Sequence, residues 1–191
     1  VGVGVAGIVD ADQGILRQSP IYGWDNVPLR QMLQSKLNVP IYIENDVNTL
    51  TLTERWFGPG QGVDNFLTVT VGRGVGLGIV VNGQFYRGQN GGAGELGHTT
   101  IDPQGPLCAC GKHGCLEAYV GDHALVRAAN EEFERGHLSM QVETIDDLLS
   151  LAKNGDPSAI QIFKKAGGIL GGISNGDPVV VDLPSRRLDI D

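Results

Sequence analysis

The sequence predicts a mixed α/β protein, and three observations carry that prediction. Apolar, β-branched runs of strand length lie at residues 1–9, 66–71 and 77–81. The dipeptide Asn82-Gly83 separates two apolar runs and therefore predicts a two-residue hairpin turn. Apolar residues at helical spacing then predict a helical tail. Its helices are expected near residues 116–120, 122–135, 144–153 and 157–170.

The first third of the chain predicts two helices around a short strand. A turn-rich stretch follows the opening strand. Pro28 then opens a helix, because proline suits a first helical turn and apolar residues follow at helical spacing. Ile41–Ile43 is expected to be a strand. It leads into Asn45-Asp46, which can cap a helix over about residues 47–57.

The segment GPGQGVD, residues 58–64, is rich in turn formers and predicts a lobe boundary. The remainder of a first α/β lobe is expected at 1–62 and a second lobe at 63–191. Within the second lobe, a glycine run precedes a short strand expected near 98–101. Thr144, with Asp147 three residues later, resembles a capping box at the start of a helix.

Composition and charge exclude several classes of protein. The 191 residues contain 14 Lys+Arg and 22 Asp+Glu, a formal charge of −8. Because duplex binding needs cations that neutralise phosphates, this chain is not expected to hold nucleic acid by itself. No apolar stretch approaches the ~18 residues of a membrane span. No signal peptide is visible, so we expect a cytoplasmic protein. The first residues lack an initiator Met and predict a piece of a longer chain.

Glycine is unusually frequent, and it is concentrated in the middle of the chain. Of the 29 glycines, 17 fall between Gly58 and Gly121. Such a segment is expected to contain tight turns and close backbone approaches, where ligands usually lie.

All three cysteines lie in one loop, CACGKHGC, as Cys108, Cys110 and Cys115. Three cysteines cannot pair completely, and a disulfide between Cys108 and Cys110 would be strained. Soft thiolates in so tight a loop suit Zn²⁺, and a structural zinc site normally has four ligands. His98 and His113 can each supply the fourth ligand, and spacing alone does not choose between them. The alternative is three unrelated reduced cysteines.

The segment GGAGELGHTTIDPQGPLCACGKHGCLEAYVG resembles the signature of the ROK family, named for repressors, open reading frames and sugar kinases. The pattern G-E-x-G-H, nine residues and then C-x-C-G-x-x-G-C-x-E is matched at every defined position. Earlier positions agree as well, namely Gly7 with Asp10, Asn45-Asp46-x-Asn48, and Glu54 four residues before Gly58. The resemblance covers residues 1–130 well and the rest loosely.

The resemblance implies an actin-like ATPase fold, which is ribonuclease H-like and typical of the sugar kinase, heat-shock protein and actin superfamily. That fold has two α/β lobes around a cleft, and its N-terminal part is expected to be missing here. Family members bind a structural zinc ion and commonly form dimers or tetramers. The matching zinc ligands are His98, Cys108, Cys110 and Cys115.

The resemblance also implies a sugar site. Its contacts match Asn45, Asp46, Glu95, His98 and Glu117. Carboxylates and an amide suit a sugar, because they form directional, charge-assisted hydrogen bonds with hydroxyls. Zinc on one ring nitrogen of His98 would orient the other toward the sugar. Simpler alternatives exist: Asp46 as a helix cap, Asn45 in a turn, and the two glutamates as solvated carboxylates. The joint occurrence of all five favours the sugar site.

Two functions are compatible with this resemblance. In the kinases of the family, Asp46 would be the general base, and phosphate-binding loops would hold ATP and Mg²⁺. One such loop resembles Gly-Thr-Gly, and here it reads Gly72-Arg73-Gly74. Gly72 and Gly74 would contact nucleotide only in a kinase. Because a long cation replaces the threonine, the sequence favours a repressor.

We therefore predict the sugar-binding effector domain of a ROK transcriptional regulator, with a structural zinc site. A homodimer or homotetramer is expected, with DNA bound only through a region absent from this chain and no membrane partner. The alternative is a glucokinase-like ROK sugar kinase that uses ATP and Mg²⁺. A plain zinc-stabilised interaction module explains the cysteines but not the predicted sugar contacts. Residues 171–191 resemble the family's glycine-rich helix and strand, with a shortened apolar helix after Asn175.

Overall fold

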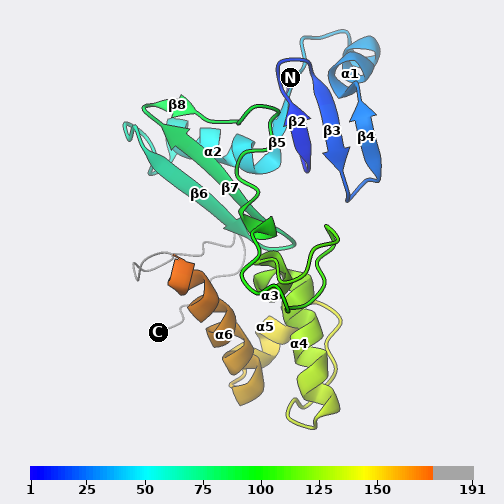
Figure 1. Ribbon diagram of the computed structural model, residues 1–191, viewed down its shortest axis with the longest axis vertical. Coiled ribbons are helices and arrows are strands. Elements are labelled where there is room, and N and C mark those ends of the chain that lie inside the picture. The colour runs from blue at the N-terminus through cyan, green and yellow to red at the C-terminus, as the bar shows by residue number, and fades with distance from the viewer. Residues whose placement is uncertain (174–191) are drawn as a thin grey trace. The chain divides into compact units, whose positions relative to one another are not determined.

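The computed structural model describes residues 1–173, which form two compact units. Unit 1 consists of Val1–Val69 and Gly76–Glu95, and unit 2 consists of Thr70–Val75 and the chain from Leu96 onward. Strands dominate the blue-to-green first half of the chain in Figure 1, and helices dominate the second half. The protein is therefore α/β, as predicted. The lobe boundary between residues 62 and 63 stays a prediction.

The eight strands among the described residues form three small sheets. Their bounds are β1 (Gly2–Val5), β2 (Ile8–Asp10), β3 (Ile15–Ser19), β4 (Trp24–Val27), β5 (Tyr42–Asn45), β6 (Phe66–Val71), β7 (Val75–Val81) and β8 (Gln84–Phe85). Strand β1 pairs with β5 in parallel. Strands β2, β3 and β4 form an antiparallel sheet in chain order. The third sheet has the order β6-β7-β8.

The opening of the chain differs from the single strand expected over residues 1–9. The strand is interrupted between β1 and β2, where Gly7 has a φ of 128°. A side chain there would collide with the backbone carbonyl of Gln18 on β3. The stretch before Pro28 has the expected turns, at residues 11–14 and 20–23, but it also contains β3 and β4, which were not predicted.

The two helices of unit 1 begin close to the predicted positions. Helix α1 (Leu29–Leu37) starts directly after Pro28, which confirms the expected proline start. Helix α2 (Asp46–Phe57) follows β5 directly. Its N-cap is Asn45, whose Oδ1 accepts a hydrogen bond from the backbone N–H of Asn48 at 3.0 Å. The helix-cap role considered for Asp46 is thus performed by Asn45.

The hairpin turn predicted at Asn82-Gly83 is confirmed. Both residues have positive φ angles, 52° and 69°, as a two-residue turn of type I′ requires. Strands β7 and β8 pair antiparallel on either side, with Val81 opposite Gln84. The main core of unit 1 is small and consists of Val5, Val9, Leu16, Leu29, Ile41 and Ile43.

Unit 2 is mainly helical, and its helices confirm the expected tail. They are α3 (Glu117–Val120), α4 (Asp122–Glu134), α5 (Ile145–Lys153) and α6 (Pro157–Ile173), preceded by a 3₁₀ turn, η1 (Leu96–His98). The strand expected near 98–101 is wrong. The N–H of Thr99 closes the 3₁₀ turn on the carbonyl of Leu96, and only Thr100 forms a bridge, with Cys115.

The capping box predicted at Thr144 is present. Thr144 Oγ1 accepts from the N–H of Asp147 at 3.3 Å, and Asp147 Oδ2 accepts from the N–H of Thr144 at 2.8 Å. Helix α5 thereby begins in a fixed direction and buries Leu148 completely. Burying one such leucine contributes roughly 1.5–3 kcal/mol. Leu116, Leu125 and Leu138 belong to the same core.

Between residues 1 and 173, no helix combines the length and apolar character needed to cross a membrane. The expected strand and shortened helix after Asn175 lie outside the described residues.

Candidate functional site

One histidine and three cysteines of unit 2 form a cluster. His98 ends the 3₁₀ turn η1, and Cys108, Cys110 and Cys115 belong to the loop that follows. One ligand atom from each of the four residues lies within 4.8 Å of all the others. Cys108 and Cys115 are buried and Cys110 is exposed, so the group lies at the edge of the unit.

The loop is held in this shape by short-range contacts. Cys108 Sγ lies 3.6 Å from His98 Nδ1, and Cys110 Sγ lies 3.6 Å from Cys115 Sγ. The Nζ of Lys112 donates to the backbone carbonyl of His98 at 2.7 Å, which ties the loop back to η1. His113 is outside the group, because its Nδ1 lies 2.9 Å from the carbonyl oxygen of Gly105. The geometry therefore favours His98 as the fourth donor.

The thiols perturb one another's proton affinity. Burial, together with the neighbouring Cys110 and Cys108, raises the pKa of the Cys115 thiol to about 12. Burial also acts to raise the pKa of Cys110. Hydrogen bonds from the Lys112 N–H and the two other thiols, with the Lys112 charge, outweigh it, so the pKa of Cys110 is lowered. The Cys110 thiol therefore loses its proton more readily than the Cys115 thiol, and a divalent cation would stabilise the deprotonated forms of both.

Asn45 and Asp46 lie at the junction between β5 and α2. The amide of Asn45 makes two contacts, since its Oδ1 caps α2 and its Nδ2 donates to the carbonyl of Gly7 at 3.0 Å. Asp46 is the first residue of α2, and its Oδ1 accepts from the N–H of Val47 at 3.0 Å. Asn45 is half-buried and Asp46 is exposed. Asp46 therefore places a carboxylate at the N-terminal end of α2.

Glu117 is the first residue of α3, two positions after Cys115. Its Oε2 accepts a hydrogen bond from the backbone N–H of Val75 at 2.9 Å. Glu95, exposed, directly precedes η1 and thus lies three residues before His98. Glu117 is therefore close in sequence to the cysteine loop, and Glu95 is close in sequence to His98.

Gly72, Arg73 and Gly74 form the turn between β6 and β7. The N–H of Gly72 donates to the carbonyl of Gly74 at 3.0 Å, and the carbonyl of Gly72 accepts from the N–H of Asp122 at 2.8 Å. Asp122 is the first residue of α4, so the turn is fastened to the start of that helix. Arg73 is exposed at its tip.

The structure brings together the four predicted metal ligands. Of the predicted sugar contacts, Asn45, Asp46 and Glu95 belong to unit 1, and His98 and Glu117 belong to unit 2. Their grouping around one sugar stays a prediction. Sequence reasoning missed Glu44, the residue before Asn45, which accepts hydrogen bonds from the Asn45 N–H and from Asn48 Nδ2. Its position beside Asn45 was the available signal.

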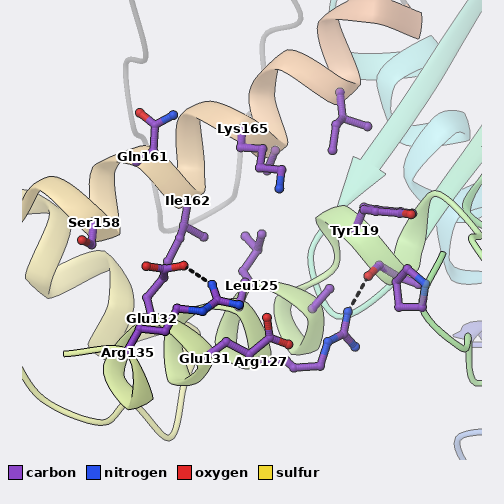
Figure 2. Close-up of a pocket in the computed structure, with 16 residues that line it drawn as sticks. Tyr119, Leu125, Arg127, Glu131, Glu132, Arg135, Ser158, Gln161, Ile162 and Lys165 are labelled. Carbon is purple, nitrogen blue, oxygen red and sulfur yellow. Dashed lines mark hydrogen bonds and ion pairs between the residues drawn. The ribbon is translucent and has the colours of Figure 1, made fainter. Parts of the chain in front are cut away.

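A pocket of about 600 Å³ lies in unit 2 between α4 and α6 (Figure 2). Leu125 and Ile162 contribute apolar walls, and Arg127, Glu131 and Lys165 contribute charges of both signs. None of the predicted metal, sugar or nucleotide residues lines this pocket. It is therefore separate from the chemistry considered above.

Comparison with known proteins gives consistent matches over most of the chain. The ROK family model matches residues 1–176. The glucokinase of Thermotoga maritima is 37% identical over 171 residues, which are 85% of this chain and 54% of that protein. The xylose repressor of Bacillus subtilis is 36% identical over 176 residues, which are 92% of this chain and 44% of that protein.

The fold is shared as well. The crystal structure of a ROK family glucokinase from Streptomyces griseus, in complex with glucose and AMPPNP, matches with a TM-score of 0.80 at 31% identity. The match covers 91% of this chain and 61% of that one.

The architecture and its matches define an α/β protein with the actin-like fold of the sugar kinases. The chain belongs to the ROK family, as its signature indicated. It spans about half the length of the curated relatives it matches. Because those relatives include both a repressor and a glucokinase, membership does not by itself select between the two functions.

Proposed function

We propose that this chain is the sugar-binding effector part of a ROK transcriptional regulator. The observation that carries the choice of regulator over kinase is the turn Gly72-Arg73-Gly74. Its backbone already bonds within the turn and to the start of α4. The exposed Arg73 places a long cation at the position where the Gly-Thr-Gly loop of the family's kinases has a small hydroxyl residue. A turn so altered supports a protein that keeps its sugar site without phosphoryl transfer.

The proposal includes a structural Zn²⁺ held by His98, Cys108, Cys110 and Cys115. Three sulfurs and one imidazole nitrogen within 4.8 Å are a donor set that zinc prefers. Four protein ligands would leave no open coordination position, so the ion would act as a cross-link. It would fasten η1 to the cysteine loop and to the start of α3, where Glu117 lies.

The proposed sugar contacts are Asn45, Asp46, Glu95, His98 and Glu117. Ionised carboxylates and an amide accept and donate short hydrogen bonds to hydroxyl groups. An epimer that leaves one of these groups unpaired would bind more weakly. With Nδ1 of His98 facing the cysteine sulfurs, Nε2 would be the ring nitrogen that contacts sugar. Glucose and xylose are suitable probes, because the matched relatives include a glucokinase and a xylose repressor.

As a regulator, the protein would bind operator DNA through a region outside this chain, as a homodimer or homotetramer in the cytoplasm. The charge of −8 suits a sensor that does not itself contact phosphates. Sugar would act by stabilising one of two states that differ in operator affinity.

A ROK sugar kinase is the second candidate, and the 37% identity to a glucokinase supports it. In that case Asp46 would accept the proton of the attacking hydroxyl. Gly72 and Gly74 would then contact the nucleotide, with Mg²⁺ on its phosphates.

The test is ADP release by the full-length, zinc-loaded protein with Mg-ATP and a panel of hexoses and pentoses. Thermal shift with the same sugars reports binding, Asp46→Asn probes the site, and Asp64→Asn is the exposed control. We expect a sugar-dependent rise in Tm, abolished by Asp46→Asn only, with no ADP release. Sugar-dependent ADP release that Asp46→Asn removes would establish the kinase instead. Absence of both responses to every sugar would overturn both candidates.

A further inference from the structure

Glu44, on β5, forms an ion pair with Arg87, and neither residue is among the proposed sugar contacts. Its Oε2 accepts from Arg87 Nε at 2.7 Å. Its Oε1 accepts from the N–H of Asn45 and from Asn48 Nδ2, both at 3.0 Å. Both oxygens of this carboxylate therefore have partners, and two of the three donors lie at the junction that presents Asn45 and Asp46.

Arg87 is the second residue of the loop that runs from the end of β8 to Glu95. The loop is closed on itself by a hydrogen bond from the N–H of Ala93 to the carbonyl of Arg87 at 3.1 Å. Its far end is attached to β7, because the carbonyl of Gly94 accepts from the N–H of Leu77 at 3.1 Å. The guanidinium of Arg87 lies 4.9 Å from the ring centroid of Phe85, which restricts its orientation.

We propose that Glu44 and Arg87 are positioning residues of the sugar site. Their ion pair joins the loop that carries Glu95 to the β5–α2 junction that carries Asn45 and Asp46. All five residues belong to unit 1, so the link is made within one compact body. The inference rests on the sugar-binding part of the proposed function, which the regulator and the kinase share.

The partial burial of this ion pair makes the loss of either partner costly. The side chain of Glu44 is 13% exposed and that of Arg87 is 40% exposed, so the carboxylate is more shielded than its partner. Removing the cation would leave Oε2 of a shielded carboxylate unpaired, which is costlier than breaking a surface pair. The group can relieve that cost by turning toward water, and the hydrogen bonds from Asn45 and Asn48 would then be lost.

The experiment is sugar titration calorimetry on the full-length, zinc-loaded protein with D-glucose and D-xylose as probes. The variants are Arg87→Gln, Arg87→Lys, Glu44→Gln and the double variant Glu44→Gln/Arg87→Gln. Arg17→Gln is the matched control, because Arg17 pairs with Asp10 in the same unit at 2.6 Å with similar exposure, 32% and 16%. Tm is recorded for every variant.

We expect Arg87→Gln and Glu44→Gln each to weaken sugar binding about tenfold, with the double variant no weaker than either. Arg87→Lys should recover most of the loss, since it keeps the cation, and Arg17→Gln should change affinity less than twofold. Losses that add in the double variant, or an equal loss in Arg17→Gln, would overturn the inference.

Should Arg87→Gln not fold, the isosteric Glu44→Gln provides the same comparison. Sugar affinity within twofold of the parent protein in that variant would be decisive against a positioning role. If the parent protein binds neither these sugars nor any other, the proposed function itself is overturned. Because that result comes from the parent protein alone, it is distinguishable from a failure of the positioning role, which is seen only in the variants.

Discussion

Glu117 and Val75 are joined by a hydrogen bond that spans 42 positions of sequence, from the Val75 N–H to Glu117 Oε2 at 2.9 Å. The neighbouring residue must be small for this contact to exist. A Cβ on Gly74 would lie 2.8 Å from the same carboxylate oxygen. Gly74 therefore shapes the surroundings of a proposed sugar contact, whether or not any nucleotide binds there.

Gly74→Ala should displace the Glu117 carboxylate while leaving the fold largely intact, because the end of a flexible side chain can move. We expect a stability loss of about 1 kcal/mol or less and a several-fold weaker sugar response, measured by urea unfolding and calorimetry. Gly72→Ala is the control, since a Cβ at Gly72 meets nothing within 4 Å. Equal sugar affinity in the two variants would contradict this account of Gly74.

Cys110→Ser should abolish high-affinity zinc binding, because it removes one of four ligand atoms that lie within 4.8 Å. Metal content measured by mass spectrometry should fall from about one zinc per chain to near zero, and Tm should fall with it. His113→Ala is the control, because His113 bonds to Gly105 outside the group. Unchanged zinc in Cys110→Ser would refute the metal site.

The capping box of α5 predicts an acid-sensitive contribution to stability. Hydrogen bonds from the Thr144 hydroxyl, the Thr144 N–H and the Glu143 N–H lower the pKa of Asp147 below its ordinary value of 3.8. Because the folded-state pKa is the lower one, this stability is present above pH 3.8 and is lost as the pH falls through the folded value. Urea unfolding of the parent and Asp147→Asn at several pH values should show a difference that shrinks in acid. A constant difference would contradict the prediction.

Ser19 on β3 is 1% exposed, and its Oγ has no hydrogen-bond partner among the described residues. Replacing it by alanine removes an unpaired polar atom from the interior, so Ser19→Ala should increase the free energy of unfolding by about 1 kcal/mol. Thr51→Ala should have the opposite sign, because the buried Thr51 Oγ1 donates to the carbonyl of Val47. Comparable destabilisation in both would show that Ser19 has a partner.

The elements that sequence patterns predicted well are those set by neighbours within four positions. The turn at Asn82-Gly83 and the capping box at Thr144 are of this kind, because their own side chains and φ angles decide them. Strands β3 and β4 were missed because they are short and polar, with Arg17 and Asp25 among their residues. They are strands only because they pair with each other and with β2.

The candidate site divides in the same way. The cysteine loop was visible as three thiols within eight positions, yet the choice of His98 over His113 needed the family signature or the folded chain. The pairing of Glu44 with Arg87 had no sequence signal, since 43 positions separate them and each residue alone is an ordinary surface type. Contacts of that range depend on how strands are ordered, which local patterns do not specify.

The division of the chain into its two units has a consequence for synthesis on the ribosome. Residues 70–75 belong to unit 2, yet they emerge before unit 1 is complete, because unit 1 needs the chain up to Glu95. The hydrogen bond from the Val75 N–H cannot form until Glu117 has been synthesised. A nascent chain can therefore complete its strand-rich body while the Val75 amide is still bonded to water, and unit 2 can close around this turn only after Glu117 has emerged.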